Sequence, residues 1–245
     1  MQQVVLVTGA SSGLGYVIAE HFAQLGHQVI LSASTLEKAQ QAVSLSAYAQ
    51  NLYPLKLDIS KEQDFKAAIT WIDQQFNGLD VLINNATMTK ATPVLEITAD
   101  DFDQITQVNQ RGTFQACQLI GKYMANKGFG RIVNIASLAG QNGGTATGAH
   151  YAASKGAIVT LSKIFAKEFA ASGVTVNAIA PGPLESPMVH SVVPTAKINQ
   201  FIDNIPVKAL GNMEFIAQTC ALLASPNAGF VTGATWDING GLFMR

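Results

Sequence analysis

Cysteine is scarce in this sequence, and histidine is scattered. Among 245 residues only Cys117 and Cys220 are cysteines, and the four histidines are not clustered. Neither set matches a metal-ligand or redox spacing, so we expect no metal site and interpret both cysteines as small buried apolar residues. A disulfide framework is not expected either, which favours a reducing compartment, the cytoplasm.

An excess of one charge is also lacking, and so is a long apolar run. The chain has 15 basic and 16 acidic residues, a net charge of −1, and this balance does not favour nucleic acid or an anionic membrane as a partner. The apolar run Val4–Val7 is far too short to span a bilayer. No charged leader or small-residue cleavage site accompanies it, so a signal peptide is not expected.

What the chain does have is apolar material in short runs. Hydrophobic residues make up 48% and charged residues 13%, enough for the core of one large domain spanning residues 1–245. Continuous rather than alternating apolar runs are typical of parallel strands covered on both faces. The predicted strands are Val4–Val7, Val29–Leu31, Leu55–Leu57, Val81–Ile83, Ile132–Ala136, Val174–Ile179 and Thr235–Ile238.

Longer segments with helical patterning separate these strands. They are Gly13–Leu25, Leu36–Ala49, Glu62–Phe76, Ala99–Lys127, Ala152–Ser172 and Met213–Ala224. Ser60 and Gln63 are spaced as a capping box for the third helix, and Thr98 can cap the fourth. The alternation of strand and helix predicts an α/β fold, a doubly wound parallel sheet of the Rossmann type with helices on both faces. The proline-rich segment 183–208 is predicted to be a lid over the ligand crevice.

A glycine-rich loop joins the first predicted strand to the first predicted helix. Gly9 and Gly13 permit a tight turn, while Gly13 and Gly15 let the backbone approach a pyrophosphate closely. Free N–H groups at the helix start can bind phosphate. A tight turn without a ligand is the alternative interpretation, but three glycines between a strand and a helix favour a dinucleotide site.

Further motifs follow this loop in a fixed order. They are the loop T-G-x-x-x-G-x-G at Thr8–Gly15, Asn84-Asn85-Ala86, Val108-Asn109, Ser137, Tyr151-x-x-x-Lys155 and Pro181-Gly182. Along its whole length the chain resembles the classical short-chain dehydrogenase/reductase family. Within that family, its endings Val231-Thr232-Gly233 and Asn239-Gly240-Gly241 resemble the 3-oxoacyl-[acyl-carrier-protein] reductase branch.

The resemblance implies a set of cofactor-binding residues. Asp58 and Ile59 would hold the adenine and Asn85 the adjacent ribose, although Asp58 could instead be a helix-start or loop carboxylate. The whole set is Gly9, Ser11, Ser12, Gly13, Leu14, Gly15, Ser34, Asp58, Ile59, Asn85, Ala86, Tyr151, Lys155, Pro181, Gly182 and Leu184.

The end of the second predicted strand bears on the choice of nicotinamide cofactor. An NAD enzyme usually places an acid here to bind the ribose 2′-OH, but the matching residue is Ala33 and no acid precedes Glu37. A carboxylate would repel a 2′-phosphate, whereas Ser34 can donate a hydrogen bond to it and Lys38 adds positive charge. Because Ser12 stands where many NADP enzymes carry a basic residue, NADP(H) is favoured and NAD(H) is kept as the alternative.

Tyr151 and Lys155 are the predicted centre of catalysis. Hydride transfer to a carbonyl needs a proton donor for the developing alkoxide. Four residues apart, the two side chains share one helical face, so the lysine charge is expected to lower the pKa of the tyrosine. A Tyr/Lys pair at this spacing also arises by chance, and a lone tyrosine is more often a packing residue.

Ser137 and Asn109 complete the predicted constellation. The Ser137 hydroxyl is suited to polarise the substrate oxygen, although alone it could simply cap a turn. The resemblance implies that Asn109 holds a water linking Lys155 to solvent, while alone it could be a buried amide bonded to backbone. His150 is interpreted as a pocket or surface residue rather than an acid or base.

These residues favour an NADP(H)-dependent carbonyl reductase/alcohol dehydrogenase that reduces a 3-oxoacyl thioester. The alternatives are a dehydrogenase of another small secondary alcohol, sugar or steroid, and a non-catalytic NAD(P)-binding sensor or scaffold. The resemblance implies delivery of the pro-S hydride, a thioester substrate on CoA or acyl carrier protein, and a homotetramer. The helical segments Phe102–Tyr123 and Ala157–Phe169 are the expected subunit contacts.

The chain departs from the family pattern at three places. Thr87 stands where a glycine usually follows Asn-Asn-Ala, and it would be strained if that position needs a positive φ. Tyr151 stands 14 residues after Ser137, one more than in many relatives, and Gly128 and Ser172 stand near positions where carrier-protein reductases often have arginines. The candidate pocket residues Thr89, Gln141, Gly144, Thr147, His150 and Met188 have mixed polarity and select no one substrate.

Overall fold

A seven-stranded parallel sheet forms the centre of the molecule in the computed structural model, which describes residues 2–144, 147–186 and 198–244. The strand order is β3-β2-β1-β4-β5-β6-β7, and every neighbouring pair is parallel. The strands are β1 (Val4–Val7), β2 (Gln28–Ala33), β3 (Leu52–Lys56), β4 (Val81–Asn84), β5 (Gly130–Ile135), β6 (Val174–Pro181) and β7 (Thr235–Ile238). The predicted doubly wound parallel sheet is confirmed.

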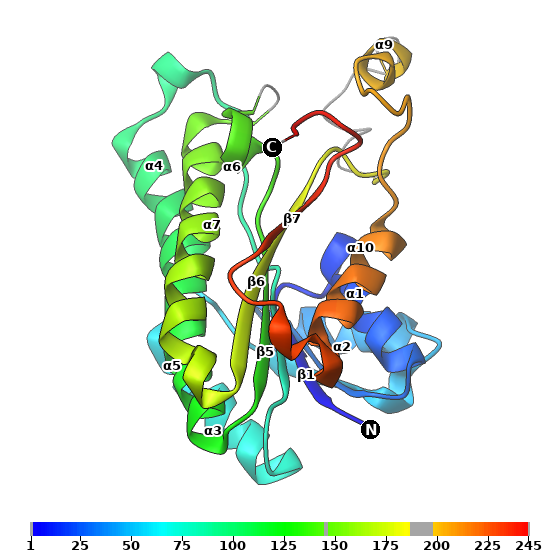
Figure 1. Cartoon of the computed structure of the whole chain (residues 1–245), viewed down its shortest axis with the longest axis vertical. Coiled ribbons are helices and arrows are strands. Elements are labelled where there is room, and N and C mark those ends of the chain that lie inside the picture. The colour runs from blue at the N-terminus through cyan, green and yellow to red at the C-terminus, as the bar shows by residue number, and fades with distance from the viewer. Residues whose placement is uncertain (1, 145–146, 187–197, 245) are drawn as a thin grey trace.

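Helices cover both faces of this sheet (Figure 1). One layer consists of α1 (Gly13–Gln24), α2 (Leu36–Leu45) and α10 (Met213–Ala224). The other consists of α3 (Glu62–Phe76), α5 (Gly112–Lys127) and α7 (Ala149–Phe169). Shorter elements are α4 (Ala99–Ile105), η3 (Thr106–Arg111), α6 (Ala139–Asn142) and α9 (Ile198–Asp203), with the single turns η1 (Ala49–Asn51), η2 (Val94–Glu96), η4 (Ala170–Ser172) and η6 (Pro226–Phe230).

The apolar strands contribute side chains to two hydrophobic cores, one on each face of the sheet. In β1 the side chains of Val5 and Val7 pack toward α1 and α10, while Val4 and Leu6 pack toward α3 and α5. Successive side chains of a strand point to opposite faces, so a strand buried on both sides must be apolar throughout. The strand order reverses between β1 and β4, and this arrangement opens a ligand crevice at the carboxyl ends of the strands.

Several predicted boundaries differ from the observed ones. β3 runs over Leu52–Lys56 and includes Pro54, which an edge strand tolerates because one side of its backbone has no partner. The predicted long helix Ala99–Lys127 is interrupted by the π-helical segment η3. The capping box at Ser60 is wrong: Ser60 donates its hydroxyl to Asp58 at 2.7 Å instead. Thr98 does cap α4, accepting from the Asp101 N–H at 3.1 Å.

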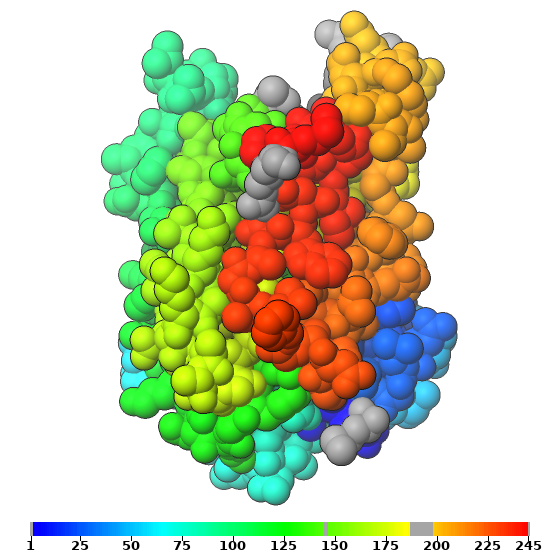
Figure 2. Space-filling model, in the orientation of Figure 1, coloured from blue at the N-terminus to red at the C-terminus, as the bar shows by residue number. Residues whose placement is uncertain are grey.

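The carboxyl edge of the sheet lies between two raised parts of the surface. In Figure 2 the chain before α4 and the helix α9 stand above the rest of the molecule on either side of this edge. β7 and the residues after it cover the middle of the face of the molecule that both figures show (Figures 1 and 2). Within the described residues, no helix is both long and apolar enough to cross a membrane.

Candidate active site

The loop between β1 and α1 has the geometry of a phosphate cradle. Gly9 and Gly13 adopt φ values of 61° and 56°, in the left-handed region that favours glycine. A Cβ on Gly15 would lie 2.4 Å from Asn85 Nδ2 and 2.5 Å from the Gly9 carbonyl oxygen. Ser12 precedes α1 without a side-chain cap, so the N–H groups of the first turn are available to an anion. The loop therefore fits the diphosphate of a dinucleotide.

Thr8 and Asn85 tie this loop to the end of β4. The Thr8 hydroxyl accepts from the N–H groups of Asn85 and Ala86, each at 3.0 Å. In return Asn85 Nδ2 donates to the carbonyl oxygens of Thr8 and Gly9, each at 3.1 Å. Asn85, predicted to hold a ribose, is thus also the residue that shapes the glycine loop. Thr8 was not singled out from the sequence, although it opens the glycine motif.

The end of β2 lies beside the glycine loop without an acid. Ala33 is buried and Ser34 is exposed. Thr35 caps α2 by accepting from the Lys38 N–H at 3.4 Å. Lys38 and Ser11 line one shared cavity of about 210 Å³. The positive charge expected near a 2′-phosphate therefore lies beside the loop predicted to bind the diphosphate.

Asp58 is held as a loop carboxylate at the end of the third strand. Its Oδ1 accepts from both the N–H and the hydroxyl of Ser60, and Lys61 lies 3.4 Å from Oδ2. Burial raises the pKa of Asp58, but the hydrogen bonds from Ser60 and Lys61 outweigh it and leave the pKa below its usual range. Ile59 is buried against Gly112 of α5. The contacts agree with the loop interpretation of Asp58 and leave its role toward adenine a prediction.

Ser137 and Tyr151 meet at the carboxyl edge of β5. The chain after β5 continues along β6, with the Leu138 N–H donating to the Pro181 carbonyl at 2.9 Å. Burial raises the pKa of Tyr151, and a side-chain hydrogen bond from Ser137 offsets part of that rise. The Ser137 oxygen also accepts from the Ala139 N–H at 3.1 Å. The predicted pair is therefore brought together from two different elements.

Lys155 lies beside Tyr151, as the spacing predicted, but it does not lower the pKa of the tyrosine. Its Nζ is 5.6 Å from the centre of the Tyr151 ring and donates to the Ile135 carbonyl at 2.7 Å. The side chain is fully buried, and burial lowers the pKa of Lys155 to about 7. The expected lowering of the Tyr151 pKa is wrong because burial penalises both charged forms.

Asn109 lies in the π-helical segment η3 and is fully buried. Its Oδ1 accepts from the Met88 N–H at 2.7 Å, and its Nδ2 donates to the Met88 carbonyl at 2.8 Å and to Ser154 Oγ at 3.0 Å. Ser154 in turn donates to the Tyr151 carbonyl at 2.7 Å. Asn109 thus links the chain after β4 to the first turns of α7. π-helical turns often occur at functional sites, and η3 was not predicted.

The chain after β6 closes the other side of the site. Gly182 donates to the Ile238 carbonyl at 2.9 Å, and a Cβ on it would lie 2.8 Å from Asn239 Cα. Leu184 forms a bridge with Gly211. The predicted cofactor residues Pro181, Gly182 and Leu184 are therefore held against β7 and the chain before α10.

Comparison with known proteins agrees with this geometry. Residues 9–243 match a family model described as enoyl-(acyl carrier protein) reductase. The 3-oxoacyl-[acyl-carrier-protein] reductase FabG of Staphylococcus epidermidis is 34% identical over 246 residues, covering 100% of both chains. FabG of Vibrio cholerae is 35% identical over 242 residues, covering 99% of this chain and 98% of the relative. The chain belongs to the short-chain dehydrogenase/reductase family.

A solved structure supports the same family. A short chain dehydrogenase from Bacillus anthracis superposes with a TM-score of 0.88 at 31% identity, covering 99% of this chain and 97% of the other. Membership makes the protein an oxidoreductase acting on CH–OH and C=O groups. The resemblance inferred from the order of the motifs is confirmed.

The described residues bear on two of the departures from the family pattern. Among the described non-glycine residues only Asn77 and Lys208 have positive φ, so Thr87 is not strained as a glycine replacement. After Ser137 the chain forms α6 and then turns through Gly143 and Gly144, at φ values of 86° and 69°. The described part of the longer Ser137–Tyr151 segment thus contains one short helix and two glycines with positive φ.

A close contact between α6 and α7 was missed from the sequence. A Cβ on Gly140 would lie 2.5 Å from both the Gly156 nitrogen and the Lys155 carbonyl carbon. Gly140 therefore lets α6 lie directly on the backbone of α7 next to Lys155. Two glycines 16 residues apart could have suggested a close crossing, but only the fold shows that they meet.

His150 is buried rather than at the surface. It has 0% exposure, its Nδ1 accepts from the Tyr151 N–H at 2.9 Å, and its Nε2 has no partner in the described part of the chain. Since Nδ1 accepts, the proton of the neutral ring is on Nε2. Of the other candidate pocket residues, Thr147 lies in the turn before α7, whereas Met188 is outside the described residues.

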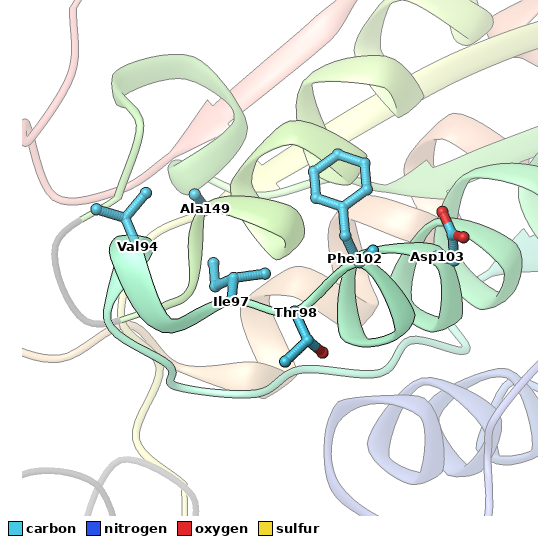
Figure 3. Close-up of a pocket in the computed structure, with 7 residues that line it drawn as sticks. Val94, Ile97, Thr98, Phe102, Asp103 and Ala149 are labelled. Atoms are coloured by element: carbon cyan, nitrogen blue, oxygen red, sulfur yellow. The ribbon is translucent and has the colours of Figure 1, made fainter.

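An apolar cavity lies outside the catalytic constellation (Figure 3). It has a volume of about 430 Å³ and is lined by residues from the chain before α4, from α4 itself and from Ala149 at the start of α7. In Figure 3 Val94, Ile97 and Ala149 lie near one another. None of Ser137, Tyr151 and Lys155 lines it, so this cavity does not mark the catalytic constellation.

Proposed function

We propose that this protein reduces a 3-oxoacyl thioester to the 3-hydroxyacyl thioester with NADPH. The observation that carries the proposal is the contact between Ser137 and Tyr151 beside the buried Lys155. Two hydroxyl donors at one point suit a carbonyl oxygen that becomes an alkoxide. The curated relatives that are 34–35% identical along the whole chain carry the name 3-oxoacyl-[acyl-carrier-protein] reductase.

In this mechanism the bound nicotinamide supplies the hydride, and the protein handles the substrate oxygen and the proton. Ser137 donates a hydrogen bond to the substrate oxygen, and Tyr151 gives it the proton. Because burial keeps the pKa of Tyr151 high, the phenol is protonated at neutral pH, as reduction requires. Lys155 would bind the nicotinamide ribose. Because both amide hydrogens of Asn109 are already donated to Met88 and Ser154, Asn109 would hold a water between Lys155 and solvent only by accepting a hydrogen bond from it.

The reaction is tested with matched thioesters. Purified protein and NADPH are followed at the reduced-nicotinamide absorbance with acetoacetyl-CoA, which has a ketone, and with crotonyl-CoA, which has only a C=C bond beside the thioester. We expect oxidation of NADPH with acetoacetyl-CoA alone. Turnover of crotonyl-CoA alone would favour the enoyl reduction named by the family model.

If neither thioester reacts, the alternatives are another small secondary alcohol, a sugar or a steroid. A non-catalytic sensor or scaffold would bind the cofactor and turn over none of these. The association of Ser137, Tyr151 and Lys155 argues against that last alternative, because a protein that only binds the cofactor does not need a proton donor aimed at a substrate oxygen.

We propose NADP(H) as the cofactor, with NAD(H) as the alternative. Ala33→Asp is expected to shift the ratio of kcat/KM for NADPH over NADH by about 10- to 100-fold toward NADH. A carboxylate at this position repels the 2′-phosphate and accepts from the 2′-OH. Ala33→Asn is the control of equal size without charge. An equal shift in both variants would refute the electrostatic argument.

We also propose that the acyl group arrives on CoA or on an acyl carrier protein in the cytoplasm, and that residues 183–208 form a substrate lid. An acidic carrier would need exposed cations, and Lys122 and Lys167 are exposed while Lys127 is paired with Asp73 at 2.7 Å. The first described residues of the lid are anchored, since Pro183 and Glu185 pair with Gly211. Residues 187–197 of the predicted lid lie outside the described residues.

We propose a homotetramer as the assembled form. Large apolar side chains are exposed on the α4, α5 and α7 side at Phe102, Phe114 and Ile164, and on the C-terminal side at Leu222 and Phe230. Two separate apolar faces suit a tetramer with two kinds of interface. Sedimentation equilibrium is expected to give four times the chain mass; a monomer alone would reject the assembly.

A further inference from the structure

A side-chain hydrogen bond connects α6 to β7 beside the active site. Gln141 Nε2 donates to Asp237 Oδ1 at 2.5 Å, although the two residues are 96 positions apart. The other amide atom, Gln141 Oε1, is buried and has no partner in the described part of the chain. A carboxylate can only accept, so Asp237 determines which way the Gln141 amide faces. The bond with Asp237 therefore decides how this side chain is oriented.

The register of the sheet places Asp237, an exposed residue, on the face of the sheet that carries α6 and α7. Asp237 pairs with Ala180 of β6. Ala180 packs with Ala136, which follows β5, and with Ile158 of α7. Figure 1 shows α6 beside this part of β7. Residues paired across two strands point to the same face, so the Asp237 carboxylate lies on the face that α6 approaches.

The short helix α6 starts two residues after Ser137 and has two other attachments. Gly140 packs on the backbone of α7, and the Leu138 N–H donates to the Pro181 carbonyl at 2.9 Å. A four-residue helix has too few internal hydrogen bonds to be stable by itself, so its place depends on such attachments. A shift of α6 would move Ser137 directly, because the Ser137 carbonyl accepts from the Gly140 N–H at 3.0 Å and Ser137 Oγ accepts from the Ala139 N–H.

We propose that Asp237 is a positioning residue for the reaction, acting through Gln141 to hold α6 and thereby Ser137 against Tyr151. The inference rests on the proposed function to the extent that Ser137 binds the substrate oxygen. The inference that Asp237 helps to hold α6 in place rests only on the Gln141–Asp237 hydrogen bond and the packing of Gly140 on α7.

Exchanging donor and acceptor tests the bond without removing volume. Gln141→Glu places a second carboxylate against Asp237, so the two side chains repel. Asp237→Asn keeps an acceptor for Gln141 and is expected to cost less. In the double variant Gln141→Glu/Asp237→Asn the new amide donates to the new carboxylate, so the bond is restored with its direction reversed. Gln74→Glu, at an exposed position of α3, is the control for the added charge.

Two measurements are made on all five proteins. Steady-state reduction of acetoacetyl-CoA with NADPH is expected to show kcat about 10- to 100-fold lower in Gln141→Glu, because small misplacements near reacting groups have effects of this size. The KM for NADPH should stay within about twofold, the double variant should recover most of kcat, and Gln74→Glu should behave as wild type. The alkaline limb of the pH profile should move to higher pH in Gln141→Glu, since Tyr151 loses the hydrogen bond from Ser137 that lowers its pKa.

Hydrogen–deuterium exchange of residues 138–143 needs no substrate and separates the two hypotheses. Faster exchange in Gln141→Glu and recovery in the double variant support the placement of α6 even if acetoacetyl-CoA is not reduced. In that case only the proposed substrate fails. Unchanged exchange and kcat in Gln141→Glu, or a double variant no better than the single one, would overturn the role of Asp237.

Discussion

Tyr151→Phe is expected to lower kcat for ketone reduction by about 10²- to 10⁴-fold, the range that a positioned proton donor contributes. The substitution removes one oxygen and leaves the ring in place. Tyr151 is the phenol that the Ser137 hydroxyl contacts, so its oxygen is the one placed to protonate the substrate. Initial rates with NADPH and acetoacetyl-CoA measure the loss, and cofactor fluorescence measures NADPH binding, which should change little.

Tyr123→Phe is the matched control, because Tyr123 also loses a hydroxyl contact but lies on the surface of α5. Its hydroxyl donates to Asp73 at 2.5 Å, away from the catalytic constellation. We expect near wild-type turnover from this variant. If Tyr151→Phe retained more than about a tenth of the wild-type rate, Tyr151 would not be the proton donor.

Lys155→Met is expected to lower kcat/KM by about 10²-fold or more while making the cofactor-free protein more stable near neutral pH. The activity falls because Lys155 lies beside Tyr151 and is the residue proposed to bind the ribose. The stability rises because a fully buried ammonium is replaced by an apolar side chain of similar length. Methionine leaves the Ile135 carbonyl without its 2.7 Å donor, which cancels part of the gain.

The sign of the pH dependence follows from the lowered pKa of Lys155. That pKa is about 7 in the folded protein, against about 10.4 for an unperturbed lysine. Between these values the unfolded chain binds a proton that the folded protein does not, so stability rises with pH across this window. The loss of stability caused by the low pKa of Lys155 is therefore largest below pH 7 and disappears above the pKa of the unfolded chain.

Melting temperatures without cofactor at pH 6 and pH 10 measure this effect. Lys155→Met should melt about 3–10 °C above wild type at pH 6, and the difference should shrink toward pH 10. Lys163→Met, at an exposed position of the same helix, should melt like wild type at both values. Equal melting of Lys155→Met and wild type at pH 6 would contradict a destabilising buried charge.

Much of the fold could be predicted because its signals are local. The run Val4–Val7 and the helix Met213–Ala224 have the predicted bounds, since buried parallel strands and amphipathic helices follow directly from apolar spacing. The predicted strand Leu55–Leu57 differs from the observed Leu52–Lys56 because proline usually interrupts a strand. Pro54 is tolerated here because β3 lies at the edge of the sheet.

The identity of the active-site residues could be predicted from the sequence, but their pKa values could not. The amino-acid pattern alone was enough to predict the glycine loop, the doubly wound sheet and the family order of Ser137, Tyr151 and Lys155. Backbone conformation and side-chain spacing depend on residues that are close in the chain, so they can be predicted from the sequence. By contrast, tertiary packing is what makes burial, rather than the lysine charge, control the pKa of Tyr151. It alone also brings Gln141 to Asp237, because desolvation and long-range contacts exist only once distant segments pack together.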